Sequence, residues 1–383
     1  VPPGGKHIER VLVPAHTPLP SDSTPLQLIR ARHAVVPFED PSEFLKLRQW
    51  VLNPTNALNG AVSSGGMDIA AAVVTGVGGS GKTRLAVELC HDLSAKGWYT
   101  GFLPTTTDVT NEELLALTEL ITELLVVVDY AEEGQRGLLA KMFRILQNRR
   151  SPTRIVLTAR GADTWWDDFR EEMEQDGIDL SNTLVISNLG KKHQEVDRGL
   201  FREIYRRAVL SFSNAMTKSV PRGIDVPEEL GDTALDAVLR AWLVVCNEGT
   251  GTEEKMPTRN DLYDSVLAIE FSQWRKTPAL AEISMNHLFR AAATLSLLAP
   301  NQDEDEVDEV LSRLPEWEHE HLRRSRFAEL LVHTLLRTDS GDPMCLQPDP
   351  VAEHLILTVF GKRPDLLDRV LPCNPMEAVG IGN

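Results

Sequence analysis

The stretch that decides the fold is VVTGVGGSGKTRLA, residues 73–86, where a short apolar run meets a glycine-rich loop and then a helical pattern. The loop GVGGSGKT (76–83) matches G-x-x-x-x-G-K-T and stands between a predicted strand and a predicted helix, as this motif requires. Its glycines permit backbone conformations that turn several N–H groups toward one anion. The start of the following helix adds the positive end of its dipole. The sequence therefore predicts a loop that holds phosphate groups.

The side chains of this loop indicate a nucleoside triphosphate with a metal ion. Lys82 can reach the β- and γ-phosphates as a mobile charge, and the Thr83 hydroxyl can ligate Mg²⁺. We expect ATP or ADP with Mg²⁺, because no Asn/Thr-Lys-x-Asp guanine-reading motif is evident. The predicted nucleotide-binding residues of the loop are Gly76, Val77, Gly78, Gly79, Ser80, Gly81, Lys82, Thr83 and Arg84.

A second acidic element follows an apolar run in LLVVVDYAEE (124–133). Asp129 at the end of the predicted strand suits a magnesium ligand, which P-loop ATPases place there. A carboxylate just beyond it can polarise an attacking water as general base. Glu132 and Glu133 both qualify, and we prefer Glu132. The alternative is that these acids only cap the next helix.

A third strand end carries a basic residue, in RIVLTAR (154–160). Ligands of open α/β sheets bind at the carboxyl ends of strands, so Arg160 is placed to sense a γ-phosphate with its bidentate fork. The alternative is a surface salt bridge. The tryptophan pair that follows, Trp165 and Trp166, is expected to pack against neighbouring helices rather than to stack on a ligand.

Short apolar runs alternate with helical patterns in the first half of the chain, and this indicates an α/β fold with a parallel sheet and right-handed crossovers. The runs are continuous, as in strands buried on both faces. We predict an ASCE/AAA-like P-loop domain with a parallel five-stranded sheet, whose strands lie at 69–76, 98–103, 124–130, 154–160 and 183–189.

Four segments are predicted along the chain. Residues 1–25 are rich in proline, serine and threonine and suggest a linker or extended arm. The P-loop α/β domain is expected at 26–190. Helical periodicity then indicates a helical domain at 191–283 and a winged-helix-like domain at 284–383, in which the apolar stretch MCLQ (344–347) suggests a short strand.

Bulk composition limits the functional classes. The chain has 383 residues, and its formal charge of −17 (39 basic minus 56 acidic) makes nucleic acid an unlikely partner. No apolar run reaches the roughly 18 residues that span a bilayer. Four scattered cysteines indicate reduced thiols. We expect a cytoplasmic protein without membrane contact.

Taken together, these motifs resemble the nucleotide-binding modules of STAND ATPases, the NLR-like regulators. The resemblance is greatest to bacterial STAND proteins with tetratricopeptide sensors. Such chains carry a "VVPF" segment before the loop, a "DYAE" acidic strand, a tryptophan pair, and "PD…EHL" near the end of the module. The corresponding stretches here are HAVVPFED (33–40), DYAEE (129–133), TWWDDF (164–169) and LQPDPVAEHLI (346–356).

This resemblance implies a nucleotide-dependent switch with slow, regulatory hydrolysis. ADP would hold a closed state, and exchange for ATP would open the module and drive self-association in signalling, with anti-phage defence or stress signalling as the family's roles. An effector domain would precede the module and a sensor domain would follow it. By the same resemblance, Val36 and Pro37 would border the adenine, and Pro257 would lie where the helical domain touches the base.

Two departures from the family pattern concern the site. Many relatives carry a Gly-Arg pair after the "VPF" segment, where this chain has Glu39 and Asp40. Eukaryotic relatives carry a Met-His-Asp motif whose histidine contacts the ADP phosphate. The aligned position here is Pro348, which has no donor. His354, about one helical turn further on, could substitute, although an ordinary histidine on a helix face is the alternative.

Three other functions remain open. An AAA+ machine ATPase with continuous turnover would need an arginine finger, for which Arg149 and Arg150 are candidates without a diagnostic context. A STAND-type transcription regulator would bind DNA through its winged helix, where RRSR (323–326) is a small basic cluster. A small-molecule kinase is disfavoured, because the chain has a long helical half and no arginine-rich lid segment.

Overall fold

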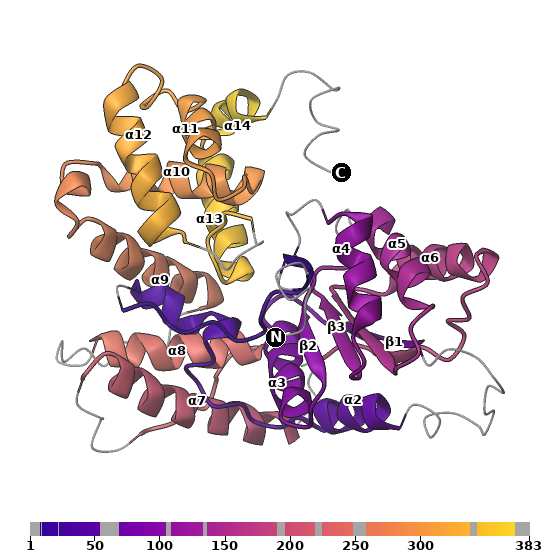
Figure 1. The fold of residues 1–383 in the computed structure, drawn as a ribbon. Helices are drawn as coiled ribbons and strands as arrows, with labels where there is room; N and C mark the ends of the chain where they lie inside the picture. The colour runs from indigo at the N-terminus through magenta and orange to yellow at the C-terminus, as the bar shows by residue number, and fades with distance from the viewer. Residues whose placement is uncertain are drawn as a thin grey trace. The chain divides into compact units, whose positions relative to one another are not determined.

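The structure is a computed structural model of the chain (Figure 1). It describes residues 8, 10–21, 23–53, 69–104, 109–132, 136–189, 196–218, 224–247, 258–337 and 343–371. Two compact units divide the chain: Val1–Thr17 with Phe38–Leu200, and Pro18–Pro37 with Phe201–Asn383. The chain passes between them three times, after Thr17, Pro37 and Leu200. We call the first the α/β unit and the second the helical unit.

The α/β unit contains the expected parallel five-stranded sheet, in the order β2-β3-β4-β1-β5. All four strand pairs are parallel. Strand β4 pairs on one side with β1, which precedes the phosphate loop, and on the other with β3, which ends beside Asp129. The predicted strands are confirmed to within a few residues. Their bounds are β1 Ile69–Thr75, β2 Tyr99–Phe102, β3 Leu124–Val128, β4 Thr153–Ala159 and β5 Leu184–Ile186.

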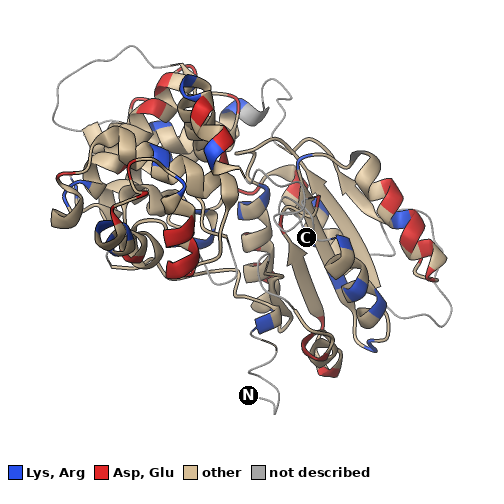
Figure 2. Cartoon of the chain, turned by 90° about the horizontal axis from the view of Figure 1, so that it is seen from above, with Lys and Arg blue, Asp and Glu red and all other residues tan. Residues whose placement is uncertain are grey.

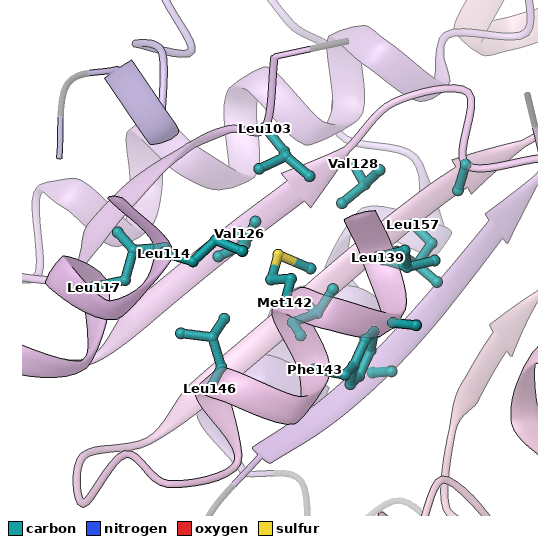
Figure 3. Close-up of a cluster of buried hydrophobic side chains, with 14 of the residues drawn as sticks. Leu103, Leu114, Leu117, Val126, Val128, Leu139, Met142, Phe143, Leu146 and Leu157 are labelled. Atoms are coloured by element: carbon teal, nitrogen blue, oxygen red, sulfur yellow. The ribbon is translucent and has the colours of Figure 1, made fainter. Parts of the chain in front are cut away.

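Side chains of the central strands alternate between two apolar clusters, because successive residues of a strand point to opposite faces. Helices α2 and α3 cover one face; α4, α5 and α6 cover the other (Figure 1). In Figure 3, Met142 and Phe143 of α5 lie against strand residues such as Val126 and Leu157. Burial on both faces explains the unbroken apolar runs. The helices span α2 Ser42–Leu52, α3 Lys82–Ser94, α4 Asn111–Ala116 with the 3₁₀ turn η4 Leu117–Glu119, α5 Arg136–Leu146 and α6 Asp163–Gln175.

The tryptophan pair of α6 packs as expected. Trp166 is buried in the cluster formed with α5, and its ring meets that of Trp165 edge-on at 5.8 Å. The Trp165 indole N–H donates to the carbonyl of Gly161 at 2.7 Å. Both rings therefore anchor α6 to the sheet.

The described part of residues 1–25, expected to be a linker or an extended arm, is not a free linker. Val11, Leu12 and Val13 are buried in the α/β unit, and Val13 exchanges two 2.9 Å backbone hydrogen bonds with Phe102 of β2. A side chain at Gly101 would meet Leu12 and Val13 at 2.9 Å, so the glycine permits this approach. The apolar residues of HIERVLVP cover an edge of the sheet that would otherwise be open.

The helical unit also departs from the predicted boundaries. Residues 18–37 belong to it rather than to the α/β unit, and the expected domains at 191–283 and 284–383 form one compact unit that begins within α7. The stretch 344–347 forms no strand, and every strand in the described residues lies in the α/β sheet. The elements are η1 Pro25–Ile29, η2 Ala31–His33, α7 Val196–Ala215, α8 Ala234–Asn247, α9 Arg259–Trp274, η5 Pro278–Leu280, α10 Met285–Leu298, α11 Glu304–Ser312, α12 His321–Leu330, the π-helical turn η6 Leu331–Leu335, α13 Asp349–Lys362 and α14 Pro364–Val370.

Charged residues of both signs are spread over the helices, as Figure 2 shows from above. Within the basic cluster RRSR, Arg324 is buried and bonds Asp308 at 2.8 Å, whereas Arg323 and Arg326 are exposed. None of the described helices is both long and apolar enough to cross a membrane.

Arg149, one of the candidates for an arginine finger, is a structural residue at the amino ends of the strands. Its side chain is 2% exposed. Its guanidinium donates to the carbonyls of Thr122 (2.6 Å) and Leu120 (2.8 Å) and to the Thr153 hydroxyl (2.9 Å). These bonds join the starts of β3 and β4, away from the strand ends that carry the acids.

We therefore expect Arg149→Met to lower the free energy of unfolding by about 2–4 kcal/mol, because it leaves buried acceptors without donors. Arg150→Met is the matched control: Arg150 is exposed, and its replacement should change stability by less than about 0.5 kcal/mol. Urea denaturation followed by circular dichroism measures both. Equal effects would show that the burial of Arg149 contributes nothing.

Candidate phosphate-binding site

The loop between β1 and α3 has the backbone shape that its glycines allow. Gly79 (φ +81°) and Gly81 (φ +98°) have left-handed conformations, which side chains rarely adopt. A side chain at Gly76 would meet the Ser80 hydroxyl at 2.7 Å and the carbonyl of Leu189 at 2.8 Å. Glycine is thus required at the first position for close packing and at the other two for backbone direction.

The amino end of α3 faces this loop. The first helical bond runs from the Leu85 N–H to the Gly81 carbonyl at 2.8 Å, so the amides of residues 82–84 precede the hydrogen-bonded ladder. Lys82 is buried, and its ammonium donates to the carbonyls of Gly76 (2.7 Å) and Val77 (3.2 Å). A positive charge and a helix dipole therefore meet at one place, as an anion site requires.

Two hydroxyls hold the carboxylate of Asp129. Thr83 donates to Oδ2 at 2.8 Å, and Thr158 donates to Oδ1. Asp129 is 8% exposed and Thr158 is 1% exposed. The orientation of the carboxylate is therefore fixed from the loop on one side and from β4 on the other.

The end of β4 makes backbone contacts to both neighbouring elements. The Ala159 carbonyl accepts from the Gly76 N–H at 3.2 Å, and the Thr158 carbonyl accepts from the Ala131 N–H at 2.9 Å. The Arg160 N–H donates to Glu132 Oε1 at 2.6 Å. Three consecutive residues of one strand end thus join the phosphate loop to the acidic turn.

Among the remaining residues predicted for catalysis, Glu132 lies in this turn, and its second oxygen, Oε2, is buried and accepts no hydrogen bond from the described residues. Arg160 is exposed at the strand end. Glu133 lies outside the described residues. The structure therefore brings Lys82, Thr83, Asp129 and Glu132 to one edge of the sheet.

Arg84 sits just after the loop with an aromatic and an acidic neighbour. Its guanidinium lies 5.2 Å from the centre of the Phe38 ring and donates to Glu88 at 2.9 Å. Phe38 in turn meets Phe44 edge-on at 5.1 Å. The "VPF" segment thereby contacts α3 through its phenylalanine.

Other residues predicted from the family resemblance lie in the helical unit. Val36 and Pro37 belong to the segment that joins this unit. His354 bonds Asp264 of α9 at 2.7 Å, and its ring meets Tyr263 edge-on at 5.6 Å. Burial raises the pKa of the Tyr263 hydroxyl to about 12. Pro257 lies outside the described residues. Their roles toward a nucleotide remain predictions.

The donor set near Asp129 fits a magnesium ion. A hydroxyl and a carboxylate oxygen, 2.8 Å apart, come from Thr83 and Asp129, and hard cations such as Mg²⁺ prefer oxygen ligands. The Ser80 hydroxyl is buried in the loop, and within the described residues it neither donates nor accepts a hydrogen bond. Thr83 and Asp129 could therefore hold the ion beside phosphate groups seated on the loop.

Sequence reasoning missed one residue of this site. Thr158 was noted only as part of a strand, yet it bonds the Asp129 carboxylate. The available signal was a hydroxyl residue near the carboxyl end of an apolar strand, at the sheet edge where the other site residues were expected.

Comparisons with known proteins found only distant structural neighbours. Neither protein-family models nor curated sequences gave a match. The structure of ORC2 from Aeropyrum pernix, solved as ADPNP–ADP complexes, has 13% identity and a TM-score of 0.36 over 88% of this chain and 98% of that chain. Cdc6p from Pyrobaculum aerophilum has 15% identity and a TM-score of 0.34 over 87% and 97%. AMPPCP-bound DnaA from Aquifex aeolicus has 10% identity and a TM-score of 0.35 over 90% and 99%. Similarity of this degree assigns no activity, so a functional conclusion must rest on the residues of the site.

We expect Thr158→Val to lower the free energy of unfolding of the α/β unit by about 1–3 kcal/mol, because a buried carboxylate oxygen loses its donor. Thr158→Ser keeps the hydroxyl and should cost about 1 kcal/mol for the lost methyl. Thermal and urea unfolding of both variants measure the difference. If the serine variant is as unstable as the valine variant, the hydroxyl contact does not hold Asp129 in place.

Proposed function

We propose that the α/β unit binds ATP with Mg²⁺ at the loop 76–83 and hydrolyses it slowly. The observation that carries this proposal is the joint placement of Lys82, Thr83 and Asp129: the ammonium lies on the loop carbonyls, and the hydroxyl bonds the carboxylate at 2.8 Å. This arrangement supplies a cation and a helix dipole for the phosphates. It also supplies oxygen ligands for Mg²⁺, which neutralises phosphate charge when bound.

Glu132 is proposed as the general base for hydrolysis. Its Oε1 accepts from the Arg160 N–H at 2.6 Å, which holds the carboxylate at the strand edge, and its Oε2 accepts no bond from described residues. An oxygen of that kind can take a proton from water. Arg160, exposed one residue beyond β4, is proposed to contact the γ-phosphate.

The output of the cycle is proposed to be a conformational switch, as the resemblance to STAND ATPases implies. The α/β unit is joined to the helical unit by three chain connections, so a nucleotide that favours one arrangement of the units can bias the whole chain. Switching requires that ADP and ATP differ in their affinity for the two states. Helices α10 to α14 are proposed to correspond to the family's winged-helix domain, and opening is proposed to allow self-association.

Two alternatives are less well supported by the residues. A machine ATPase would need an arginine finger; of the two candidates, Arg149 is held by backbone carbonyls at the far end of the strands, whereas Arg150 is exposed and stays a candidate. A DNA-binding regulator would use RRSR, in which Arg324 is buried. We therefore propose a nucleotide rather than nucleic acid as the ligand, and signalling rather than continuous work as the role.

The first test is Lys82→Ala, which removes the ammonium from the loop. ATP affinity is expected to fall about 100-fold, because hydrogen bonds to charged groups contribute ~1.5–3 kcal/mol each. Lys96→Ala is the matched control, because Lys96 follows the same helix and pairs with Asp92 at 2.5 Å. Isothermal titration with ATP and Mg²⁺ measures both. Unchanged affinity of Lys82→Ala would refute the assignment of the loop.

The second test identifies the nucleotide that elutes with the purified chain. We expect tightly held ADP in the wild type. Glu132→Gln should hold ATP instead, because loss of the base slows hydrolysis by about 100-fold or more. If ADP elutes with Glu132→Gln and ATP elutes with Glu133→Gln, the general base is Glu133 instead. An empty wild-type chain with rapid turnover would favour the machine over the switch.

A further inference from the structure

A segment that precedes the phosphate loop is built into the helical unit. Residues 18–37 belong to the helical unit, whereas the chain before and after them belongs to the α/β unit. We call residues 24–30, which contain η1, the strap. Gln27 and Arg30 are 5% and 7% exposed. Polar side chains are seldom buried to this extent without partners, so their contacts are informative.

The strap is attached first to α8 and α9. The Leu26 N–H, at the start of η1, donates to Glu270 Oε2 at 2.8 Å. Trp242 donates from its indole to the Pro25 carbonyl at 3.0 Å. Glu270 also accepts from Trp274 at 3.0 Å. Burial raises the pKa of Glu270, while the hydrogen bonds from the Leu26 N–H and the Trp274 indole and the charge of Arg30 oppose that rise. A carboxylate at the amino end of η1 is a favourable cap.

The strap is attached a second time at the end of α12. Gln27 Nε2 donates to the Thr334 carbonyl at 3.0 Å, and Arg30 donates to the Arg337 carbonyl. These carbonyls lie in and after the π-helical turn η6, which continues α12. The last carbonyls of a helix lack partners within it, and a guanidinium there also complements the dipole. The strap thereby caps the carboxyl end of this helix.

We propose that the strap is a latch that holds α8 and α9 to the carboxyl-terminal helices. Its bonds to Glu270 and Trp242 lie on one side, and its bonds to the carbonyls of Thr334 and Arg337 lie on the other. Direct contacts between the two groups of helices also exist, such as Phe271 with Phe289 at 4.6 Å and His354 with Asp264. The latch adds the four strap bonds to these direct contacts, and all four are lost together if the strap detaches from the helices.

The chain connections make the latch responsive to the α/β unit. Both flanks of residues 18–37 are fixed there: Val13 pairs with β2, and Phe38 lies against Arg84, the residue after Thr83. A change at the start of α3 can therefore pull on the strap through Phe38. This last step rests on the proposed function, whereas the latch itself does not.

The latch is tested with Gln27→Met/Arg30→Met, which keeps the apolar stems and removes both donors. The matched control is Arg313→Met, because Arg313 also caps a helix end, donating to the Val370 carbonyl of α14 at 3.1 Å, but within the carboxyl-terminal helices. Hydrogen exchange followed by mass spectrometry is measured without nucleotide. Helices α10 and α13 carry none of the four strap bonds, yet their amides should exchange about tenfold faster in the double variant than in the wild type. In the Arg313→Met control, the amides of α10 and α13 that face α9 should exchange at the wild-type rate.

Faster exchange confined to residues 24–33 and 331–337 would overturn the latch, because the strap would then be a local clamp. If circular dichroism shows the double variant to be unfolded, Gln27→Met alone should still accelerate α10 and α13, about threefold, and no acceleration would equally overturn it. The same measurements on a Lys82→Ala background separate the two proposals. If exchange in α10 and α13 is still accelerated on this background, the latch is supported. If Lys82→Ala leaves ATP affinity unchanged in the same protein, the phosphate site is refuted independently of the latch.

Discussion

The carboxyl end of β4 is the constraint on which the candidate site depends. Thr158 bonds the Asp129 carboxylate and accepts from the Ala131 N–H, Ala159 accepts from the Gly76 N–H, and the Arg160 N–H bonds Glu132. Because β4 lies between β1 and β3, one strand end holds both the phosphate loop and the acidic turn. The bond between Thr158 and Asp129 is buried, and a buried group left without its hydrogen bond costs about 1–3 kcal/mol.

The charged side chains of the candidate site are held by neighbouring groups of the protein. The Lys82 ammonium lies on loop carbonyls, and the Asp129 carboxylate is held by two hydroxyls. A phosphate can take the place of the carbonyls at Lys82, and a metal ion can take the place of the hydroxyl hydrogen at Asp129. Little reorganisation would then be required on binding of the proposed nucleotide, which favours affinity.

The helical unit is held together by polar contacts that reach across the sequence. The buried Glu270 accepts a hydrogen bond from a short helix that lies far earlier in the chain, and Gln27 and Arg30 bond carbonyls in and just after the π-helical turn η6 that continues α12. These residues satisfy backbone groups that helix ends leave without partners. Residues 18–37 are therefore neither a free linker nor part of the α/β unit, and the division of the chain into units does not follow its linear order.

The sequence alone determined the parallel sheet, the positions of its strands and the place of the loop, because strand burial and glycine-rich turns leave local patterns. It also predicted that Lys82, Thr83, Asp129 and Glu132 would share one edge, since parallel strands end on the same side. Only the tertiary structure decided that Thr158 completes the site, that Arg149 is buried at the opposite end, and that residues 18–37 join the helical unit. These depend on side chains meeting backbone groups from distant segments, and such pairings leave no periodic signal in the sequence.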